Sequence, residues 1–249
     1  NKHSTARVRA KNERVLFRYG YKLSVSAMNG DRCILVLGGA GLVGSQIVRE
    51  IAREMEPARI VVASLYRGEV RDFLHDVRRE FAGIEFIGAW GDVFVRDEFM
   101  GENRRRLMQI RARRDTLYQD LFGGLDEAYQ RSGLAQLIRQ YKPDVIVDCI
   151  NTATAISYQD IESLSKQTHD LLDQLNQIVD HQDLGALAAL GRDLEQNVSS
   201  LLISQSLPQL IRHVQIIHRA MSESGTRLYL KVGTTGTGGM GLNIPYTHS

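Results

Sequence analysis

Short apolar runs alternate with stretches of helical spacing along most of the chain. The run Cys33–Leu37 has no polar interruption, which is typical of a strand buried on both faces of a parallel sheet. Apolar positions then recur at helical spacing from Ser45 to Met55, and Pro57 ends this pattern before a second apolar run at 60–63. Strand, helix and strand in this order predict an α/β fold with a Rossmann-type doubly wound parallel sheet.

The same alternation continues through the chain and includes a helical insertion. Six arginines lie close together in this insertion, between residues 104 and 114 and among apolar residues, and we interpret them as a solvated helix face, with a phosphate- or partner-binding patch as the alternative. The later predicted elements are, in order, a helix over 73–81, a strand over 84–87, long amphipathic helices over 97–141, a strand over 145–150, helical stretches over 160–207 with breaks near Gly185 and Gly191, a helix from Ser206 to Ser224 and a strand over 227–232.

A glycine-rich turn joins the first predicted strand to the first predicted helix. It satisfies the pattern Gly-x-Gly-x-x-Gly, and its strand–turn–helix setting is the one that dinucleotide binding requires. Glycines let backbone amides approach a pyrophosphate, and the dipole of the following helix favours the anion. We therefore expect a cofactor site here, although a merely tight turn is the alternative. The expected cofactor-binding residues of the turn are Gly38, Gly39, Gly41, Leu42, Val43 and Gly44.

The end of the second predicted strand indicates which cofactor fits. A NAD-selective site has an acidic residue about 20 positions after the glycines, where it binds the ribose hydroxyls. This chain has no carboxylate at 63–67, whereas Ser64 and Arg67 could meet a 2′-phosphate, so NADP is slightly favoured over NAD. Arg67 as a plain surface residue is the alternative. Asp92, with Val93 beside it, is expected near the adenine, or else in a turn or helix cap.

Composition agrees with an ordinary globular protein. Of the 249 residues, 43% are hydrophobic and 24% charged, and no apolar run approaches the ~20 residues of a spanning helix, which favours a cytoplasmic protein. Cys33 and Cys149 lie in apolar runs and are expected to be buried thiols. His213 and His218 are five residues apart, so they lack zinc-site spacing, and we interpret them as surface or partner-facing residues. No metal site is predicted.

The charge is distributed unevenly. Residues 1–27 have a net charge of +6 and the remainder −4, and a basic segment of this kind can bind nucleic acid, although it lacks regularly interleaved aromatic residues. The chain begins with Asn1, and Met28 leads directly into the first predicted strand. We expect residues 1–29 to be a basic N-terminal tag, leader or extension, and residues 30–249 to form one NAD(P)-binding domain.

The chain resembles the extended or atypical short-chain dehydrogenase/reductases, also called the NAD-dependent epimerase/dehydratase family. The likeness covers most of residues 30–249, and the order of its four features is more particular to the family than the glycine turn alone. The features are Gly38 to Gly44, Gly91-Asp92-Val93, Lys142-Pro143-Asp144-Val145-Ile146-Val147, and the stretch from Val232-Gly233-Thr234-Thr235-Gly236 through Ile244-Pro245-Tyr246.

The resemblance implies an oxidoreductase or epimerase/dehydratase that acts on a hydroxyl or carbonyl of a small molecule. Thr235, with Thr234 beside it, matches the Ser or Thr that holds the substrate oxygen, although both could simply shape a turn. The nicotinamide is expected near Asn151, Thr152 and Ala153. Dimerisation through the helices of residues 160–222 is common in this family, so a homo-oligomer is expected.

One feature of the family is missing from residues 1–249. Its proton donor is the tyrosine of a Tyr-x-x-x-Lys motif, and none of the nine tyrosines is followed by lysine at that spacing. Tyr246 lies in a segment that precedes the motif in relatives. The chain is therefore either the N-terminal part of a longer enzyme or a protein without the standard acid/base. A non-catalytic dinucleotide-binding sensor or scaffold is the alternative function.

Overall fold

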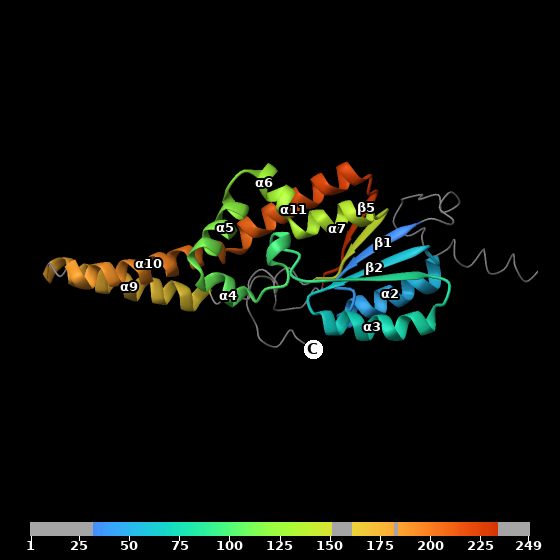
Figure 1. The fold of residues 1–249 in the computed structure, drawn as a ribbon, viewed down its shortest axis with the longest axis horizontal. Helices are drawn as coiled ribbons and strands as arrows, with labels where there is room; N and C mark the ends of the chain where they lie inside the picture. Colours follow the sequence, from blue (N-terminus) through green and yellow to red (C-terminus); the bar gives the residue numbers. More distant parts are fainter. Residues whose placement is uncertain (1–31, 151–160, 182–183, 234–249) are drawn as a thin grey trace, which may run out of the picture.

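A five-stranded parallel sheet forms the centre of the protein in a computed structural model that describes residues 32–150, 161–181 and 184–233 (Figure 1). The strand order is β3-β2-β1-β4-β5, and every pair of neighbours is parallel. This order confirms the predicted Rossmann-type α/β fold. The strands are β1 (Cys33–Leu37), β2 (Arg59–Ser64), β3 (Glu85–Trp90), β4 (Val145–Asp148) and β5 (Leu228–Lys231).

Helices cover both faces of the sheet, which explains the uninterrupted apolar run of β1. Ile34 and Val36 pack under α2 (Leu42–Met55) and α3 (Arg67–Glu80), whereas Leu35 and Leu37 face α7 (Gly133–Tyr141) and α11 (Ser206–Ser224). Figure 1 shows the two helix pairs on opposite sides of the strands. Because successive strand side chains point to opposite faces, every position of β1 is apolar and buried.

The insertion between β3 and β4 consists of short helices, so the prediction of long helices over 97–141 is wrong. Gly123 and Gly124 separate two of them, and Ser132 starts another because its hydroxyl accepts a hydrogen bond from the amide of Ala135 at 3.2 Å. Apolar spacing alone does not reveal such stops. The elements are a 3₁₀ helix (Asp97–Phe99), α4 (Arg104–Gln109), α5 (Arg111–Phe122), α6 (Leu125–Arg131) and then α7.

A helical hairpin of α9 (Ile161–His181) and α10 (Leu184–Ile203) follows β4 and extends away from the sheet (Figure 1). The predicted break near Gly185 falls next to residues 182–183, which lie outside the described residues. The predicted break at Gly191 is wrong, because this glycine lies within α10. A glycine inside a helix costs about 0.5–1 kcal/mol relative to alanine, which a long packed helix tolerates.

The remaining elements lie close to their predicted positions. Helix α11 begins at Ser206 and ends at Ser224, where Gly225 adopts the left-handed conformation that favours glycine. Both cysteines are free thiols, Cys33 buried and Cys149 half-buried. Within the described ranges, no helix combines the length and apolar character needed to cross a bilayer. The predicted extension 1–29 lies outside the described residues.

Candidate functional site

The glycine turn after β1 is shaped by contacts that side chains would prevent. Gly38 has a φ of 71°, and its carbonyl accepts the amide of Gly41 at 3.0 Å. A Cβ on Gly44 would lie 2.0 Å from the Gly38 carbonyl oxygen, so the first turn of α2 touches the backbone of the preceding loop. The glycines are spaced in this way because the end of β1 and the start of α2 pack against each other at these positions.

The turn lies where the strand order reverses. A Cβ on Gly38 would be 3.2 Å from the backbone of Cys149 and Ile150, at the end of β4. On the other side, the amide of Gly39 donates to the carbonyl of Ala63 at 3.0 Å, at the end of β2. Because the chain leaves β1 for β2 but later returns to place β4 on the opposite side, a crevice for ligands is expected at this point.

The N-terminus of α2 lies at this end of the sheet without a side-chain cap. Gly41 is the N-cap residue, and the first turn contains no acidic residue. The amide groups at a helix start lack partners inside the helix, and the dipole favours an anion there. Leu42 and Val43 are 75% and 44% exposed, although both are apolar. The helix start can therefore accept an anionic group from outside the fold.

Ser64 and Arg67 lie at the neighbouring strand end, as the sequence predicts. Ser64 is the last residue of β2 and pairs in register with Trp90, the last residue of β3. Arg67 is the first residue of α3, and its guanidinium carbon lies 4.9 Å from the centroid of the Trp90 ring. Trp90 is 47% exposed. The two predicted cofactor residues and an aromatic ring that sequence reasoning missed thus share one corner of the sheet.

Asp92 makes two contacts inside the protein. One carboxylate oxygen accepts the amide of Phe94 at 2.9 Å, and the other lies 2.9 Å from Nη2 of Arg104. The first contact is the turn role that sequence analysis gave as an alternative. Val93, which follows it, is buried, and its side chain packs in the core. Whether Asp92 also contacts an adenine stays a prediction.

The predicted nicotinamide side of the site falls outside the described residues. This applies to Asn151, Thr152 and Ala153 after β4, and to Thr234 and Thr235 after β5. The strands that lead to these residues end side by side, because Asp148 of β4 pairs in register with Lys231 of β5. Both segments therefore start from the same edge of the sheet as the glycine turn.

A buried carboxylate, missed by the sequence analysis, holds these two strand ends together. Asp148 accepts the hydroxyl of Tyr229 at 2.6 Å and the amide of Ile150 at 2.9 Å, and Nζ of Lys231 lies 3.0 Å away. Burial alone would raise the pKa of Asp148, but hydrogen bonds and the Lys231 charge bring it below its ordinary value. Burial, together with the hydrogen bond to Asp148, raises the pKa of Tyr229.

A signal for this cluster exists in the sequence. Tyr229 and Lys231 are two residues apart in a predicted strand, so both point to the same face of the sheet. Asp148 is the polar residue in an otherwise apolar predicted strand. Cys149, the next residue, points elsewhere, and burial raises the pKa of its thiol to about 11. That thiol is therefore protonated at neutral pH, which does not favour a nucleophilic role.

His213 belongs to the same region, and its prediction as a surface residue is wrong. It lies on the buried face of α11 with Ile217 and Ala220, and it is 6% exposed. Its ring is tilted against Phe94 at a centroid distance of 4.6 Å. Its Nε2 is 4.0 Å from Asp148 and has no hydrogen-bond partner among the residues that the structure describes. His218 is exposed, as expected.

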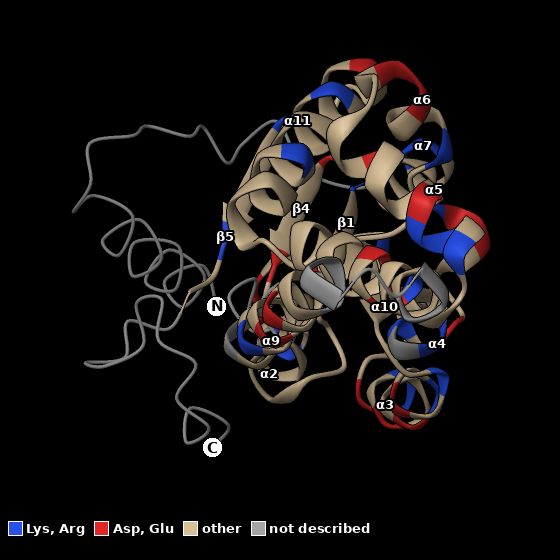
Figure 2. Cartoon of the chain, turned by 90° about the vertical axis from the view of Figure 1, so that its left-hand side faces the viewer, with Lys and Arg blue, Asp and Glu red and all other residues tan. Residues whose placement is uncertain are grey.

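The arginines of the insertion are only partly a solvated face. Arg106 and Arg111 are exposed, as interpreted, but Arg113 pairs with Glu102, and Arg114 is 3% exposed with Nη2 2.9 Å from Glu195 of α10. Figure 2 shows basic and acidic residues interspersed on α5. Helices α5 and α6 therefore present mixed charge, which does not favour a phosphate-binding patch on them, whereas α4 has arginines as its only charged residues.

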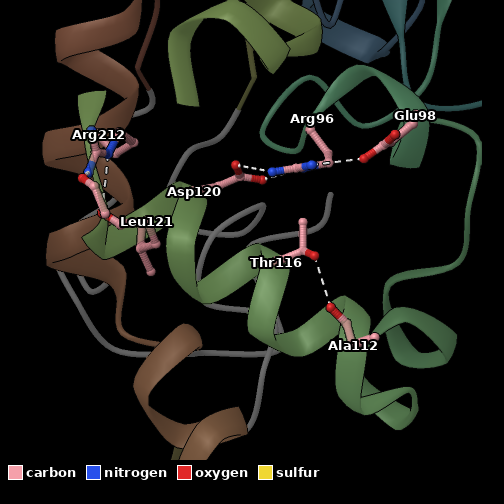
Figure 3. A network of polar contacts seen from close by, with 8 residues as sticks. Arg96, Glu98, Ala112, Thr116, Asp120, Leu121 and Arg212 are labelled. Carbon is pink, nitrogen blue, oxygen red and sulfur yellow. Dashed lines mark hydrogen bonds and ion pairs between the residues drawn. The ribbon is translucent and has the colours of Figure 1, made fainter. Parts of the chain in front are cut away.

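A small pocket lies between the insertion and α11. Its volume is about 70 Å³, and its wall combines apolar side chains with Arg96, Asp120, Arg212 and His213. Arg96 forms a bidentate pair with Asp120, at 2.8 and 2.7 Å, and Arg212 donates to the carbonyl of Leu121 (Figure 3). Arg212 also donates to the carbonyl of Gly123. The Arg96 guanidinium joins the loop after β3 to α5, and the Arg212 guanidinium joins α11 to α5, so we interpret both as structural.

Comparisons with known proteins give no family. No model of a protein family matches the chain, and no curated protein matches it. Matching solved structures include Pen from Bacillus thuringiensis, with 16% identity and a TM-score of 0.28 over 50% of this chain and 40% of that one. The chain thus spans less than half the length of Pen.

Two further solved structures cover more of the chain. L-sorbose reductase from Gluconobacter frateurii, complexed with NADPH and L-sorbose, has 12% identity and a TM-score of 0.29 over 82% of this chain and 95% of that one. An oxidoreductase of the short chain dehydrogenase/reductase family from Burkholderia thailandensis has 13% identity and a TM-score of 0.28 over 82% and 91%. At these scores we draw neither family nor activity from the likeness.

Proposed function

We propose that the chain binds a nicotinamide dinucleotide across the carboxyl ends of its strands, with the pyrophosphate at Gly38 to Gly44. The observation that carries this proposal is the 2.0 Å that would separate a Gly44 Cβ from the Gly38 carbonyl oxygen. Such packing brings a helix start with uncapped amides to the carboxyl end of β1. A merely tight turn would not require the exposed, apolar Leu42 and Val43 that flank it.

NADP is the favoured cofactor, with NAD as the alternative. The β2 end lacks the carboxylate that binds ribose hydroxyls in NAD-selective sites, and it provides the Ser64 hydroxyl and the Arg67 guanidinium. A guanidinium matches two oxygens of a phosphate group, and a hydroxyl can donate a further hydrogen bond. Arg67 makes no ion pair within the described part of the chain, so it can meet a 2′-phosphate.

The activity that fits this site is that of an oxidoreductase or epimerase/dehydratase acting on a hydroxyl or carbonyl substrate. When bound, the nicotinamide supplies or accepts the hydride. The protein has to hold the substrate oxygen, whose charge changes, and the resemblance to the extended short-chain dehydrogenase/reductases gives this role to Thr235 with Thr234. Asn151, Thr152 and Ala153 are proposed to line the nicotinamide side, and the protein is proposed to act as a homo-oligomer.

A calorimetric titration with NADPH and with NADH tests the binding proposal. Gly41→Asp places a carboxylate at the helix start, where it repels the pyrophosphate. Asp is a favoured N-cap residue, and the added Cβ, 3.2 Å from the Gly38 carbonyl oxygen, is common to the Asp and Asn variants. Gly41→Asn is the matched neutral control. We expect NADPH to bind the wild type tightly and the Asn variant more weakly, because the Asn side chain also enters the helix start, and we expect at least a further tenfold loss in the Asp variant. Equal affinity in all three would overturn the proposal.

Turnover is measured separately from binding, because the two candidate functions differ there. An enzyme would oxidise or reduce the bound nicotinamide with hydroxyl or carbonyl substrates, and the absorbance of the reduced nicotinamide reports this directly. Tight binding without turnover across alcohols, ketones and nucleotide sugars would favour the sensor or scaffold function for residues 1–249. The binding proposal would stand in that case.

A further inference from the structure

Trp90 lies on the face of the sheet that α3 covers. Phe86 and Gly88 point to this face, and a Cβ on Gly88 would lie 2.7 Å from Cδ1 of Leu74, so α3 packs tightly against β3. Trp90 is two residues further along, at the end of the strand, and therefore points to the same side. Helix α3 begins at Arg67, close to the carboxyl end of the strands where Trp90 lies, so the indole lies beside the first turn of α3 and not under the helix.

Arg67 occupies the place above this ring. Its guanidinium carbon lies 4.9 Å from the ring centroid, within the distance of a cation–π contact. It is the first residue of α3, the end of a helix where the dipole disfavours a cation. Glu69 is the acidic residue of the same turn, but no ion pair joins it to Arg67 in the described structure. The indole is thus the contact that orients this guanidinium.

We infer that Trp90 is a positioning residue for cofactor selection: its indole holds the Arg67 guanidinium at the β2 end, ready for a ribose 2′-phosphate. This inference rests on the proposed dinucleotide site. An exposed arginine is flexible and loses side-chain freedom when it binds, and a ring that already orients it reduces this loss. The planar face of the ring leaves the edge of the guanidinium free to donate to phosphate oxygens.

The chain offers a direct reporter for this arrangement, because Trp90 is its single tryptophan. A ligand that draws Arg67 towards a phosphate, or that places adenine beside the ring, changes the surroundings of the indole. The emission of this one residue therefore follows occupation of this corner without an added label. It also shows whether a nucleotide binds here rather than elsewhere on the protein.

The test compares two nucleotides that differ in the 2′-phosphate alone. Adenosine 2′,5′-bisphosphate and 5′-AMP are titrated into the full chain by calorimetry, and tryptophan emission is followed in parallel. The variants are Trp90→Leu, which keeps an apolar side chain without an aromatic face, and Trp90→Phe, which keeps a ring. Arg67→Gln removes the cation, and Tyr66→Leu is the control, because Tyr66 is an exposed aromatic residue of the same loop.

We expect the wild type and the Tyr66 variant to prefer the bisphosphate, and Arg67→Gln to lose that preference. Trp90→Leu should reduce the preference roughly two- to fivefold, as an exposed cation–π contact implies, with the affinity for 5′-AMP unchanged. The preference of Trp90→Phe for the bisphosphate should lie between the preferences of Trp90→Leu and the wild type. This readout is a ratio of affinities, so a general loss of folded protein would not produce it.

Other outcomes would overturn the inference in distinguishable ways. An unchanged preference in Trp90→Leu would mean that the ring does not position Arg67. An equal loss of affinity for both nucleotides would assign the indole to adenine stacking instead. A wild type that binds both nucleotides equally would remove the 2′-phosphate subsite and leave the dinucleotide site intact. A wild type that binds neither nucleotide, nor NADPH, would overturn the proposed function and this inference together.

Discussion

The carboxylate of Asp92, just after β3, lies 2.9 Å from Nη2 of Arg104, the first residue of α4. Its other oxygen accepts the amide of Phe94, and the Asp92 amide donates to the carbonyl of Met100 at 2.9 Å. The helical insertion is therefore attached to the sheet at the edge where the candidate cofactor site lies. An interaction that holds Asp92 in place therefore also holds Met100 and the start of α4 in place.

Breaking this pair is expected to loosen the insertion. Asp92→Asn and Arg104→Gln should each lower the free energy of unfolding by about 1–2 kcal/mol, because both side chains are largely buried and lose a charge-assisted hydrogen bond. The double variant should cost less than the two single variants added together. Urea unfolding measures this, with the exposed Arg106→Gln on the same helix as a control. Additive losses would show that the pair does not interact energetically.

Gly44 should tolerate no side chain at all. Gly44→Ala brings a methyl group within 2.0 Å of the Gly38 carbonyl oxygen, so the loop or the helix start has to move. We expect a loss of about 2–4 kcal/mol in stability and loss of dinucleotide binding. Gly68→Ala is the matched control, since a Cβ there meets open space. Thermal unfolding and NADPH calorimetry report the two effects, and an unaltered Gly44→Ala protein would refute the close packing.

Asp148 gives the stability of the protein a pH dependence. Its pKa is lower in the folded protein than its ordinary value of roughly 3.9, so its contribution is fully present above that value and is lost as the pH falls through the lower, folded pKa. Asp148→Asn should cost about 2–4 kcal/mol at pH 7, where Lys231 and Tyr229 lose their anionic partner.

The difference in stability between the wild type and Asp148→Asn should narrow as the pH falls below about 4, because the carboxyl is then protonated in the unfolded state while it stays ionised in the folded protein down to its lower pKa. Denaturant unfolding of both proteins, at pH 7 and at successively lower pH, measures this difference in the free energy of unfolding. Asp72→Asn serves as the control, because Asp72 forms an exposed pair with Arg71. A difference that stays constant down to pH 3 would mean that Asp148 is not stabilised as an anion.

Arg114 should hold the base of the helical hairpin. It is buried, it donates to the Met108 carbonyl at 2.9 Å, and it pairs with Glu195 of α10. Arg114→Ala leaves these groups without a donor, and we expect a loss of about 2–3 kcal/mol, with faster amide exchange in α10 than in α2. Arg111→Ala, at an exposed position of the same helix, should change neither the stability nor the exchange rates. Uniform exchange changes across both helices would argue against this local role.

The sheet and its layers could be predicted because they depend on local pattern. An apolar run such as β1 is readable without knowledge of its neighbours, since both faces of an internal strand are covered. The glycine turn is readable for the same reason, because Gly38 and Gly44 contact each other within one short segment. The short helices of the insertion were missed because their ends depend on glycines and one serine cap rather than on apolar spacing.

The partners of charged and aromatic residues could not be predicted from local pattern. Arg114 is buried because Glu195, 81 residues later, supplies its partner. His213 and Tyr229 meet Asp148 only when α11 and β5 pack beside β4. Trp90 meets Arg67 because β2 and β3 end at the same level of the sheet. Such pairs arise from register and helix packing, which a single sequence does not reveal.

Titration of the Trp90 emission with NADPH tests the central claim most directly, since the chain has one tryptophan and it lies at the proposed site. The dihydronicotinamide absorbs where indole emits, so a bound cofactor quenches the residue. We predict saturable quenching in the wild type and in Gly41→Asn, and none beyond simple absorption by free NADPH in Gly41→Asp. Emission that responds equally in all three proteins, or in none, would contradict a dinucleotide site at the glycine turn.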